Sequence, residues 1–219
     1  QSRGLGDVYK RQPMYNILIG GAAGQGIDTT VSILEKLLKH SGYYIYTTRD
    51  FMSRVRGGHN FSLLRFGTEV ITSHSYRLDG IIALNEETID LHKHELKEEG
   101  FVLCDSSFDY PDTDVRVMKL PMNKIAKELG NGKASASVAV GAILKLFGEP
   151  FTYVEEIMAD VMKKEILEVN LNAAKAGYSA VEAKFNHLEG GYKDCMLISG
   201  SEALGLGAVA GGLKFYSAY

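Results

Sequence analysis

Short apolar runs alternate with amphipathic stretches along the first half of this chain. Residues 15–20 form an apolar run that ends at glycine, which is typical of a buried strand. From Gly26 onward apolar residues recur at helical spacing, and glycine after Ser41 ends this predicted helix. Residues 43–48 are aromatic and β-branched and predict the next strand. The order strand, helix, strand favours a parallel sheet with a right-handed crossover.

The later segments continue this pattern and then become helical. Apolar runs predict strands over residues 61–66, 80–84, 101–104 and 115–120. Helical spacing predicts helices over residues 86–98, 123–129, 135–147, 153–163 and 166–176. The expected fold class is therefore α/β: a Rossmann-like, mostly parallel sheet with flanking helices and a helical C-terminal part.

The C-terminal segment begins a new pattern. Residues 195–199 predict a buried strand, residues 202–212 a helix rich in small residues, and residues 214–219 a further strand. Parallel strands need neighbours and covered faces. We therefore interpret residues 192–219 as the truncated start of a second α/β domain.

The N-terminal segment also differs from the rest. Residues 1–13 carry several cations without any periodicity, and Met14 follows them directly. We interpret these residues as a leader that is non-native or disordered and exclude it from the fold. The first domain is then expected over residues 14–191.

Composition narrows the class of protein. Lys and Arg total 24 against 27 Asp and Glu, a net charge of −3, so the basic excess of a dedicated nucleic-acid binder is missing. No apolar run reaches the ~18–20 residues that cross a bilayer. The cysteines, Cys104 and Cys195, lie far apart in the chain, which argues against a disulfide framework, a zinc site or a cysteine-ligated cluster. We expect a cytoplasmic protein without a metal site and without a nucleic-acid or membrane partner.

A glycine-rich loop joins the first expected strand to the first helix. It contains Gly21, Gly24, Gln25 and Gly26, in the order G-x-x-G-x-G rather than the dinucleotide order G-x-G-x-x-G, and it lacks the P-loop lysine. Backbone amides at a helix N-terminus suit an anion. Glycine also serves tight packing between strand and helix. From the residues alone, both roles of this loop stay open.

An arginine-rich segment follows the second expected strand. It contains the cationic, polar and small residues Arg49, Ser53, Arg54, Arg56, Gly57 and Gly58. In a parallel sheet this segment leaves the carboxyl end of its strand beside the glycine loop, where open α/β sheets bind ligands. Guanidinium groups offer forked donors to phosphates and carboxylates. Ligand, another subunit and solvent remain possible partners of these arginines.

The histidines predict no catalytic arrangement. His92 and His94 are two positions apart on an expected helix, so they cannot chelate one metal ion, and we expect them on a solvated face. His59 is expected to form hydrogen bonds in a loop. No Ser–His–Asp, paired-carboxylate or metal-ligand spacing is apparent, and we assign no catalytic residue and no metal ligand.

The joint pattern resembles a known family. The glycine loop between strand and helix, followed by residues 49–60 (RDFMSRVRGGHN), resembles the gamma domain of 2-oxoacid:ferredoxin oxidoreductases. Residues 199–208 resemble the first strand and helix of the alpha, pyrimidine-binding domain, which is fused behind the gamma domain in many alpha subunits. Residues 214–219 resemble the strand that leads into the family's Tyr-Pro-x-Thr-Pro motif. The resemblance covers residues 14–219.

The resemblance implies oxidative decarboxylation of a 2-oxoacid, 2-oxoglutarate or a similar one, to its acyl-CoA with electrons passed to ferredoxin. It implies thiamine diphosphate, Mg²⁺, an iron–sulfur cluster and coenzyme A in the whole complex. The diphosphate, the magnesium ion and a cluster would be held by a separate beta subunit, and this chain alone would be inactive.

For the gamma domain, the resemblance implies a role in coenzyme A access and subunit packing. The glycine loop and the arginine segment are the residues we expect to make that contact. Two alternatives stay open: a stand-alone CoA- or nucleotide-binding Rossmann-like module, and the gamma domain of an indolepyruvate:ferredoxin oxidoreductase.

Overall fold

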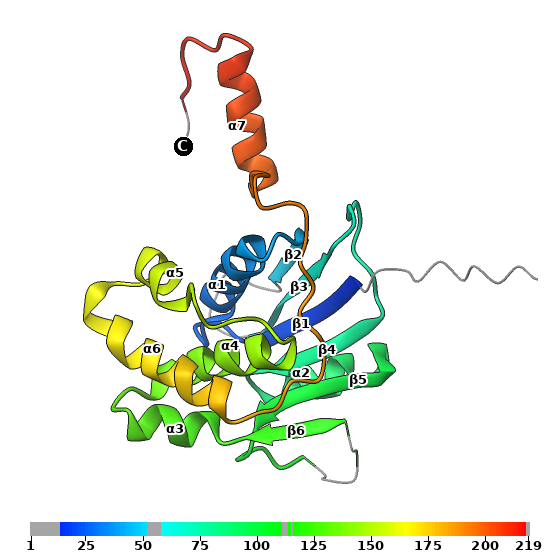
Figure 1. Ribbon diagram of the computed structural model, residues 1–219, viewed down its shortest axis with the longest axis vertical. Coiled ribbons are helices and arrows are strands. Elements are labelled where there is room, and N and C mark those ends of the chain that lie inside the picture. Colours follow the sequence, from blue (N-terminus) through cyan, green and yellow to red (C-terminus); the bar gives the residue numbers. More distant parts are fainter. Residues whose placement is uncertain (1–13, 52–57, 111–113, 115, 218–219) are drawn as a thin grey trace, which may run out of the picture.

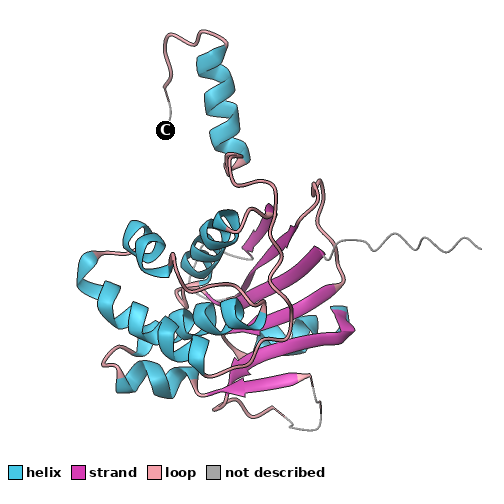
Figure 2. Ribbon diagram, in the orientation of Figure 1, coloured by secondary structure: helices cyan, strands magenta, loops and turns pink. Residues whose placement is uncertain are grey.

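A six-stranded sheet with helices on both faces forms the body of the molecule, and one helix stands apart from it (Figures 1 and 2). The computed structural model describes residues 14–51, 58–110, 114 and 116–217. The strands are β1 (Met14–Ala22), β2 (Tyr44–Phe51), β3 (His59–Gly67), β4 (Leu78–Ala83), β5 (Leu96–Asp105) and β6 (Val117–Leu120). The helices are α1 (Ile27–His40), α2 (Glu86–His92), α3 (Met122–Glu128), α4 (Ser135–Leu146), α5 (Val154–Val161), α6 (Lys164–Ser179) and α7 (Gly200–Ala210), with 3₁₀ turns η1 (Lys93–Glu95) and η2 (Gly132–Ala134). The residues of the expected leader lie outside the described part.

The sheet has the strand order β2-β3-β1-β4-β5-β6. Pairs β1–β4, β4–β5 and β5–β6 are parallel, whereas β3 is antiparallel to both of its neighbours. The expected mostly parallel α/β sheet is thus confirmed. The first crossover does not bring β2 next to β1, because β3 returns between the two strands and pairs with each of them.

Both faces of the central strands are buried, which explains why β1 is a continuous apolar run. Ile17 and Ile19 point into the larger core, which α1, α4, α5 and α6 cover. Leu18 points to the other face, where α2 contributes Ile89 to a smaller core. Figure 1 shows α2 on the far side of the sheet from α1, α4 and α6.

Helices α4 and α6 cross at very close range. A Cβ atom on Gly141 would lie 1.8 Å from the carbonyl oxygen of Ala174, and one on Gly177 would lie 1.9 Å from that of Val138. Only glycine leaves room for such backbone contact. The close crossing fixes α6 over α4 and so fixes the start of α6 near the carboxyl edge of the sheet.

The helix expected over residues 86–98 is only partly correct. Helix α2 ends at His92, the η1 turn follows, and β5 already begins at Leu96. The charged residues 97–99 resemble a solvated helix face in sequence. In the fold they extend β5, because Leu96 is buried opposite Leu78 of β4.

Two expected strands near the C-terminus are wrong as far as the structure describes them. Residues 195–198 and 213–217 lie outside any strand and are exposed, and no strand of the described chain pairs with them. A strand needs hydrogen-bonding neighbours that the body of the molecule does not offer here. The expected helix is confirmed as α7, where Ser199 and Glu202 form a capping box.

None of the helices in the described part of the chain combines the length and apolar character that crossing a bilayer requires.

Candidate functional site

The glycine loop between β1 and α1 has a shape that its sequence requires. Gly24 and Gly26 adopt left-handed φ angles of 88° and 86°, which favour glycine. The side-chain oxygen Oε1 of Gln25 accepts from the Ala22 amide at 2.6 Å, and its side-chain nitrogen donates to the Leu84 carbonyl at 2.9 Å. A side chain at Gly21 would collide with Gln25, since its Cβ would lie 2.6 Å from Oε1. Gln25 therefore holds the loop in place.

The first turn of α1 is open to a ligand. Gly26 is the N-cap residue, and no side chain caps the helix there. The amides of the first turn of a helix have no partner within the helix and carry its positive dipole end. The loop thus presents backbone donors at the carboxyl edge of the sheet, where β1 ends.

The arginine segment leaves the sheet beside this loop. Ser53, Arg54, Arg56 and Gly57 lie outside the described residues, so their side chains are not placed. The strand residues that flank the segment are placed: Phe51 pairs with Asn60, and His59 pairs with Ala22. Gly58 has a left-handed φ of 86°. Both ends of the segment therefore meet the glycine loop, as the parallel-sheet argument predicted.

A cavity of about 540 Å³ lies at this junction, lined by the loop, the start of α1, Phe51 and Asn60. Asn60 is 5% exposed, and its side-chain oxygen has no hydrogen-bond partner among the described residues. A buried amide without a partner is costly and marks a place where a polar ligand group fits. No sequence argument singled out Asn60, because its burial depends on how β3 packs against α1.

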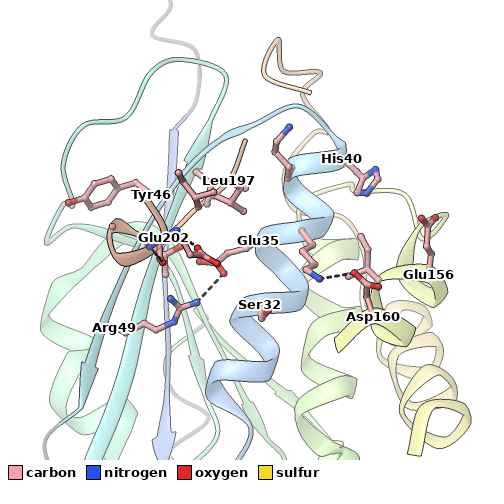
Figure 3. A pocket seen from close by; sticks show the side chains of 17 residues that line it. Ser32, Glu35, His40, Tyr46, Arg49, Glu156, Asp160, Leu197 and Glu202 are labelled. Atoms are coloured by element: carbon pink, nitrogen blue, oxygen red, sulfur yellow. Dashed lines mark hydrogen bonds and ion pairs between the residues drawn. The ribbon is translucent and has the colours of Figure 1, made fainter. Parts of the chain in front are cut away.

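Arg49 contacts the first helix. Its guanidinium pairs with Glu35 of α1 at 3.0 Å (Figure 3). It also lies 3.8 Å from Asp28 of the same helix. The charge of Arg49 is therefore matched inside the fold, and this residue joins β2 to α1.

A cavity of about 910 Å³ lies between α1, β2, α5 and residues 197–202 (Figure 3). Its cations are already engaged. Lys36 pairs with Asp160 at 2.9 Å, Arg49 pairs with Glu35, and Lys39 donates to the carbonyls of Tyr192 and Lys193. This cavity offers little free charge for a ligand.

His59 and His92 form a buried pair, contrary to expectation. Their Nε2 atoms are 2.8 Å apart, and His92 Nδ1 lies 3.1 Å from Glu95. The solvated face expected for His92 is wrong, because α2 packs on the sheet and turns His92 inward. His59 belongs to β3 rather than to a loop. Only His94 is exposed as expected.

The surroundings of this histidine pair disfavour a positive charge on His59. Burial, together with the neighbouring His92, lowers the pKa of His59. The Nδ1 atom of His59 is buried and has no hydrogen-bond partner in the part of the chain that the structure describes. Among the described residues, no group of three or more His, Cys, Asp or Glu side chains is placed to hold a metal ion.

Comparison with known proteins identifies the family. The family described as pyruvate ferredoxin/flavodoxin oxidoreductase matches residues 16–180. A 2-oxoacid:ferredoxin oxidoreductase alpha subunit from Sulfolobus is 25% identical over 92% of this chain, which spans 39% of that subunit. An indolepyruvate oxidoreductase subunit from Archaeoglobus fulgidus is 26% identical over 75% of the chain and 94% of its own length. This chain thus spans about two fifths of the curated alpha subunits it matches.

Solved structures agree with this result. A 2-oxoglutarate:ferredoxin oxidoreductase from Magnetococcus marinus superposes with a TM-score of 0.81 at 25% identity, covering 92% of this chain and 38% of that one. The gamma subunit of a keto/oxoacid ferredoxin oxidoreductase from Geobacter sulfurreducens shares the fold, with a TM-score of 0.67 at 23% identity, over 77% of this chain and 96% of its own. The resemblance drawn from the glycine loop and the arginine segment is confirmed, and the chain belongs to the pyruvate ferredoxin/flavodoxin oxidoreductase family.

Proposed function

We propose that this chain is part of the alpha subunit of a 2-oxoacid:ferredoxin oxidoreductase, an enzyme that oxidatively decarboxylates a 2-oxoacid to its acyl-CoA and passes the electrons to ferredoxin. The names of its relatives support this assignment. The Magnetococcus enzyme that shares its fold was solved with 2-oxoglutarate, coenzyme A and succinyl-CoA bound. 2-Oxoglutarate or a similar 2-oxoacid is therefore the substrate we propose, in the cytoplasm, where the free cysteines of this chain would stay reduced.

The domain division that we propose places a gamma domain over residues 14–191 and the start of a pyrimidine-binding domain over residues 192–219. Gamma-type relatives support the first unit, because they match about three quarters of this chain over nearly their whole length. The alpha subunits match 92% of it. Because the alpha subunits match more of the chain than the gamma-type relatives do, we favour an alpha subunit over a separate gamma domain of the indolepyruvate type.

Helix α7 supports the second unit. None of its residues, all of which the structure describes, is buried, and Leu204 and Val209 are 77% and 68% exposed. A helix that is apolar on all sides normally lies inside a packed core. We therefore assign α7 to a domain whose core lies outside the described residues.

The role that we propose for the gamma domain is to contact coenzyme A at the junction of the glycine loop and the arginine segment. One observation supports this proposal above the others. The uncapped start of α1 at Gly26, Asn60, whose side-chain oxygen has no partner among the described residues, and Phe51, which flanks the arginine segment, all line one cavity. Loop amides suit a phosphate of the coenzyme, and Arg54 and Arg56 would supply forked donors. Gly21 and Gln25 keep the loop in shape, while Arg49 is engaged with α1.

The described residues offer no set of ligands for a metal ion or an iron–sulfur cluster. Cys104 is buried, and Cys195 is exposed and distant from it in the sequence. Among the described residues, no cluster of metal-ligating side chains is present. We therefore assign thiamine diphosphate, Mg²⁺ and the iron–sulfur cluster to a beta subunit and assign no catalytic residue to this chain. Ferredoxin and that beta subunit are the partners we propose.

A thermal-shift titration with coenzyme A and NAD tests the coenzyme contact. We expect coenzyme A to raise the melting temperature more than NAD does, and the double variant Arg54→Gln/Arg56→Gln to lose that rise. Arg77→Gln is the matched control, because Arg77 precedes β4 at the opposite edge of the sheet. Stronger stabilisation by NAD would favour a stand-alone nucleotide-binding module instead.

A further inference from the structure

Three titratable side chains form a line on the face of the sheet that α2 covers. The line joins Glu95 of η1 to His92 of α2 and to His59 at the start of β3. The Glu95 carboxylate lies 3.1 Å from His92 Nδ1, and the Nε2 atoms of the two histidines are 2.8 Å apart. The histidines are 3% and 8% exposed, and the Glu95 side chain is 22% exposed. The line therefore runs from the surface into the interior.

Aromatic packing holds the two imidazole rings in place. The ring of Phe61 stacks on that of His59 with centroids 5.4 Å apart and lies 4.7 Å from the ring of His92. On β1, Gly20 leaves the room that the rings need, because a Cβ atom there would lie 3.1 Å from His59 Cε1. Since the rings are packed on several sides, the positions of their nitrogen atoms are fixed by the fold.

This line determines which ring nitrogens carry a hydrogen. A carboxylate only accepts hydrogen bonds, so the proton between Glu95 and His92 belongs to His92 Nδ1. The second nitrogen of a neutral imidazole is an acceptor, so His92 Nε2 accepts and the facing His59 Nε2 donates. The remaining nitrogen, His59 Nδ1, is then a bare acceptor.

His59 Nδ1 is the open end of the line. It is buried and has no hydrogen-bond partner among the residues that the structure describes. Its place in the fold is the carboxyl edge of β1, because His59 pairs with Ala22 at the start of the glycine loop. The next residue, Asn60, lines the cavity at the same edge. A buried acceptor without a donor is costly, so its presence at this edge requires an explanation.

The charged groups around the pair come from several elements. Burial and the second ring lower the pKa of His59, while Glu87 of α2 and Asp50 of β2 act in the opposite direction. On η1, Glu95 contacts the pair directly, and His94 lies 3.8 Å from the same carboxylate. Strand β1 meets the pair with a glycine and an alanine. The neutral form of the pair is therefore the favoured one.

We propose that Glu95, His92 and His59 form a one-proton switch at the carboxyl edge of the sheet. The two facing Nε2 atoms share a single proton, because two N–H groups 2.8 Å apart would repel each other. A proton taken up from solvent can then be placed only on His59 Nδ1, the ring nitrogen that is still free. It turns this atom from an acceptor into a donor, with the positive charge spread over two rings beside the Glu95 carboxylate.

The switch changes what the edge of the sheet recognises without any movement of the rings. A neutral pair accepts a hydrogen bond at His59 Nδ1, and a protonated pair donates one there. Glu95 and His92 are positioning residues, since they act on the open atom only through His59. The switch does not depend on the oxidoreductase assignment.

Long-range ¹H–¹⁵N correlation NMR of the full chain, labelled in its six histidines, tests the switch at neutral pH. We expect His92 in the Nδ1–H form and His59 in the Nε2–H form. In Glu95→Gln the side-chain amide can donate as well as accept, so we expect the reversed line, with His59 in the Nδ1–H form, to become populated. Glu98→Gln removes the same charge from an exposed position on β5 and should leave both rings unchanged.

Acidification supplies a second measurement on the unaltered chain. As the pH falls, His59 Nδ1 should take up a proton while the Nε2 atoms still share one, so that the folded pair gains one proton and not two. Nε2–H forms of both rings at neutral pH would overturn the proposal. An unchanged His59 ring in Glu95→Gln, or uptake of two protons by the folded pair, would overturn it as well.

Discussion

The Tyr43 hydroxyl donates a hydrogen bond to the buried carboxylate of Glu149 at 2.7 Å. The same carboxylate accepts from Ser41 and lies 3.0 Å from His187 Nδ1, while the Leu188 amide donates to the Tyr43 oxygen at 2.9 Å. Burial, together with the bond to Glu149, raises the pKa of Tyr43 well above its usual value. This network joins the end of α1 to the segment that follows α6 and holds that segment against the body of the molecule.

Tyr43→Phe should lower the free energy of unfolding by about 1–3 kcal/mol, because it leaves a buried carboxylate oxygen without its donor. Urea denaturation measures this change. Tyr76→Phe is the matched control, since Tyr76 is 72% exposed, and it should change stability by less than about 0.5 kcal/mol. Equal effects of the two variants would show that the network does not contribute to stability.

The His59–His92 pair should make stability depend on pH. The folded-state pKa of His59 is lowered, so the folded protein keeps this ring neutral while the unfolded chain takes up a proton near a pKa of about 6.5. The contribution of the pair is therefore fully present above that pH and is lost as the pH falls below it. Glu87, Asp50 and Glu95 lie near the pair and moderate this effect.

Urea denaturation between pH about 5 and 7.5 tests this dependence against the unperturbed pKa of histidine. His59→Asn should flatten the fall in stability on acidification, whereas His94→Asn, at an exposed position, should keep it. The same slope in both variants would assign the pH dependence to other groups.

The close crossing of α4 and α6 should not tolerate a methyl group. Gly141→Ala and Gly177→Ala should each cost about 2–4 kcal/mol, because the new Cβ would collide with backbone that cannot move aside. Gly205→Ala on α7 has nothing within 4 Å and should leave the unfolding of the sheet domain unchanged. Thermal unfolding of the three variants compares them directly, and a tolerated Gly177→Ala would argue against this helix packing.

Gln25→Ala should act on the coenzyme contact more than on stability. The variant removes the two hydrogen bonds that shape the glycine loop. We expect it to weaken coenzyme A binding by about tenfold and to lower the free energy of unfolding by about 1–1.5 kcal/mol. Arg49→Gln removes only half-exposed ion pairs with α1, which are worth about 0–1 kcal/mol, and should leave binding intact. The opposite ranking of the two variants would refute the assigned roles.

Local sequence patterns predict the helices and strands whose formation depends mainly on residues close together in the chain. The apolar run of β1 and the periodicity of α1 are sufficient to place both elements within a few residues. The end of α2 is decided instead by the pairing of Leu96 with β4, which no local pattern contains. The strand predicted over 195–199 is absent because a strand depends on neighbours elsewhere in the fold.

The candidate site shows the same division. Glycine spacing predicts the loop, and the parallel-sheet rule predicts that the arginine segment leaves beside it. The bond from Gln25 to Leu84 spans 59 positions, and the burial of Asn60, Thr30 and His92 depends on packing between distant elements. These features arise only in the folded chain.

Hydrogen–deuterium exchange of the full chain, with and without coenzyme A, tests the proposed contact most directly. The account predicts slower exchange at the amides of residues 24–29 and 51–60, and no such change with NAD. Protection by coenzyme A confined to other parts of the chain, or protection of these residues by NAD alone, would contradict it.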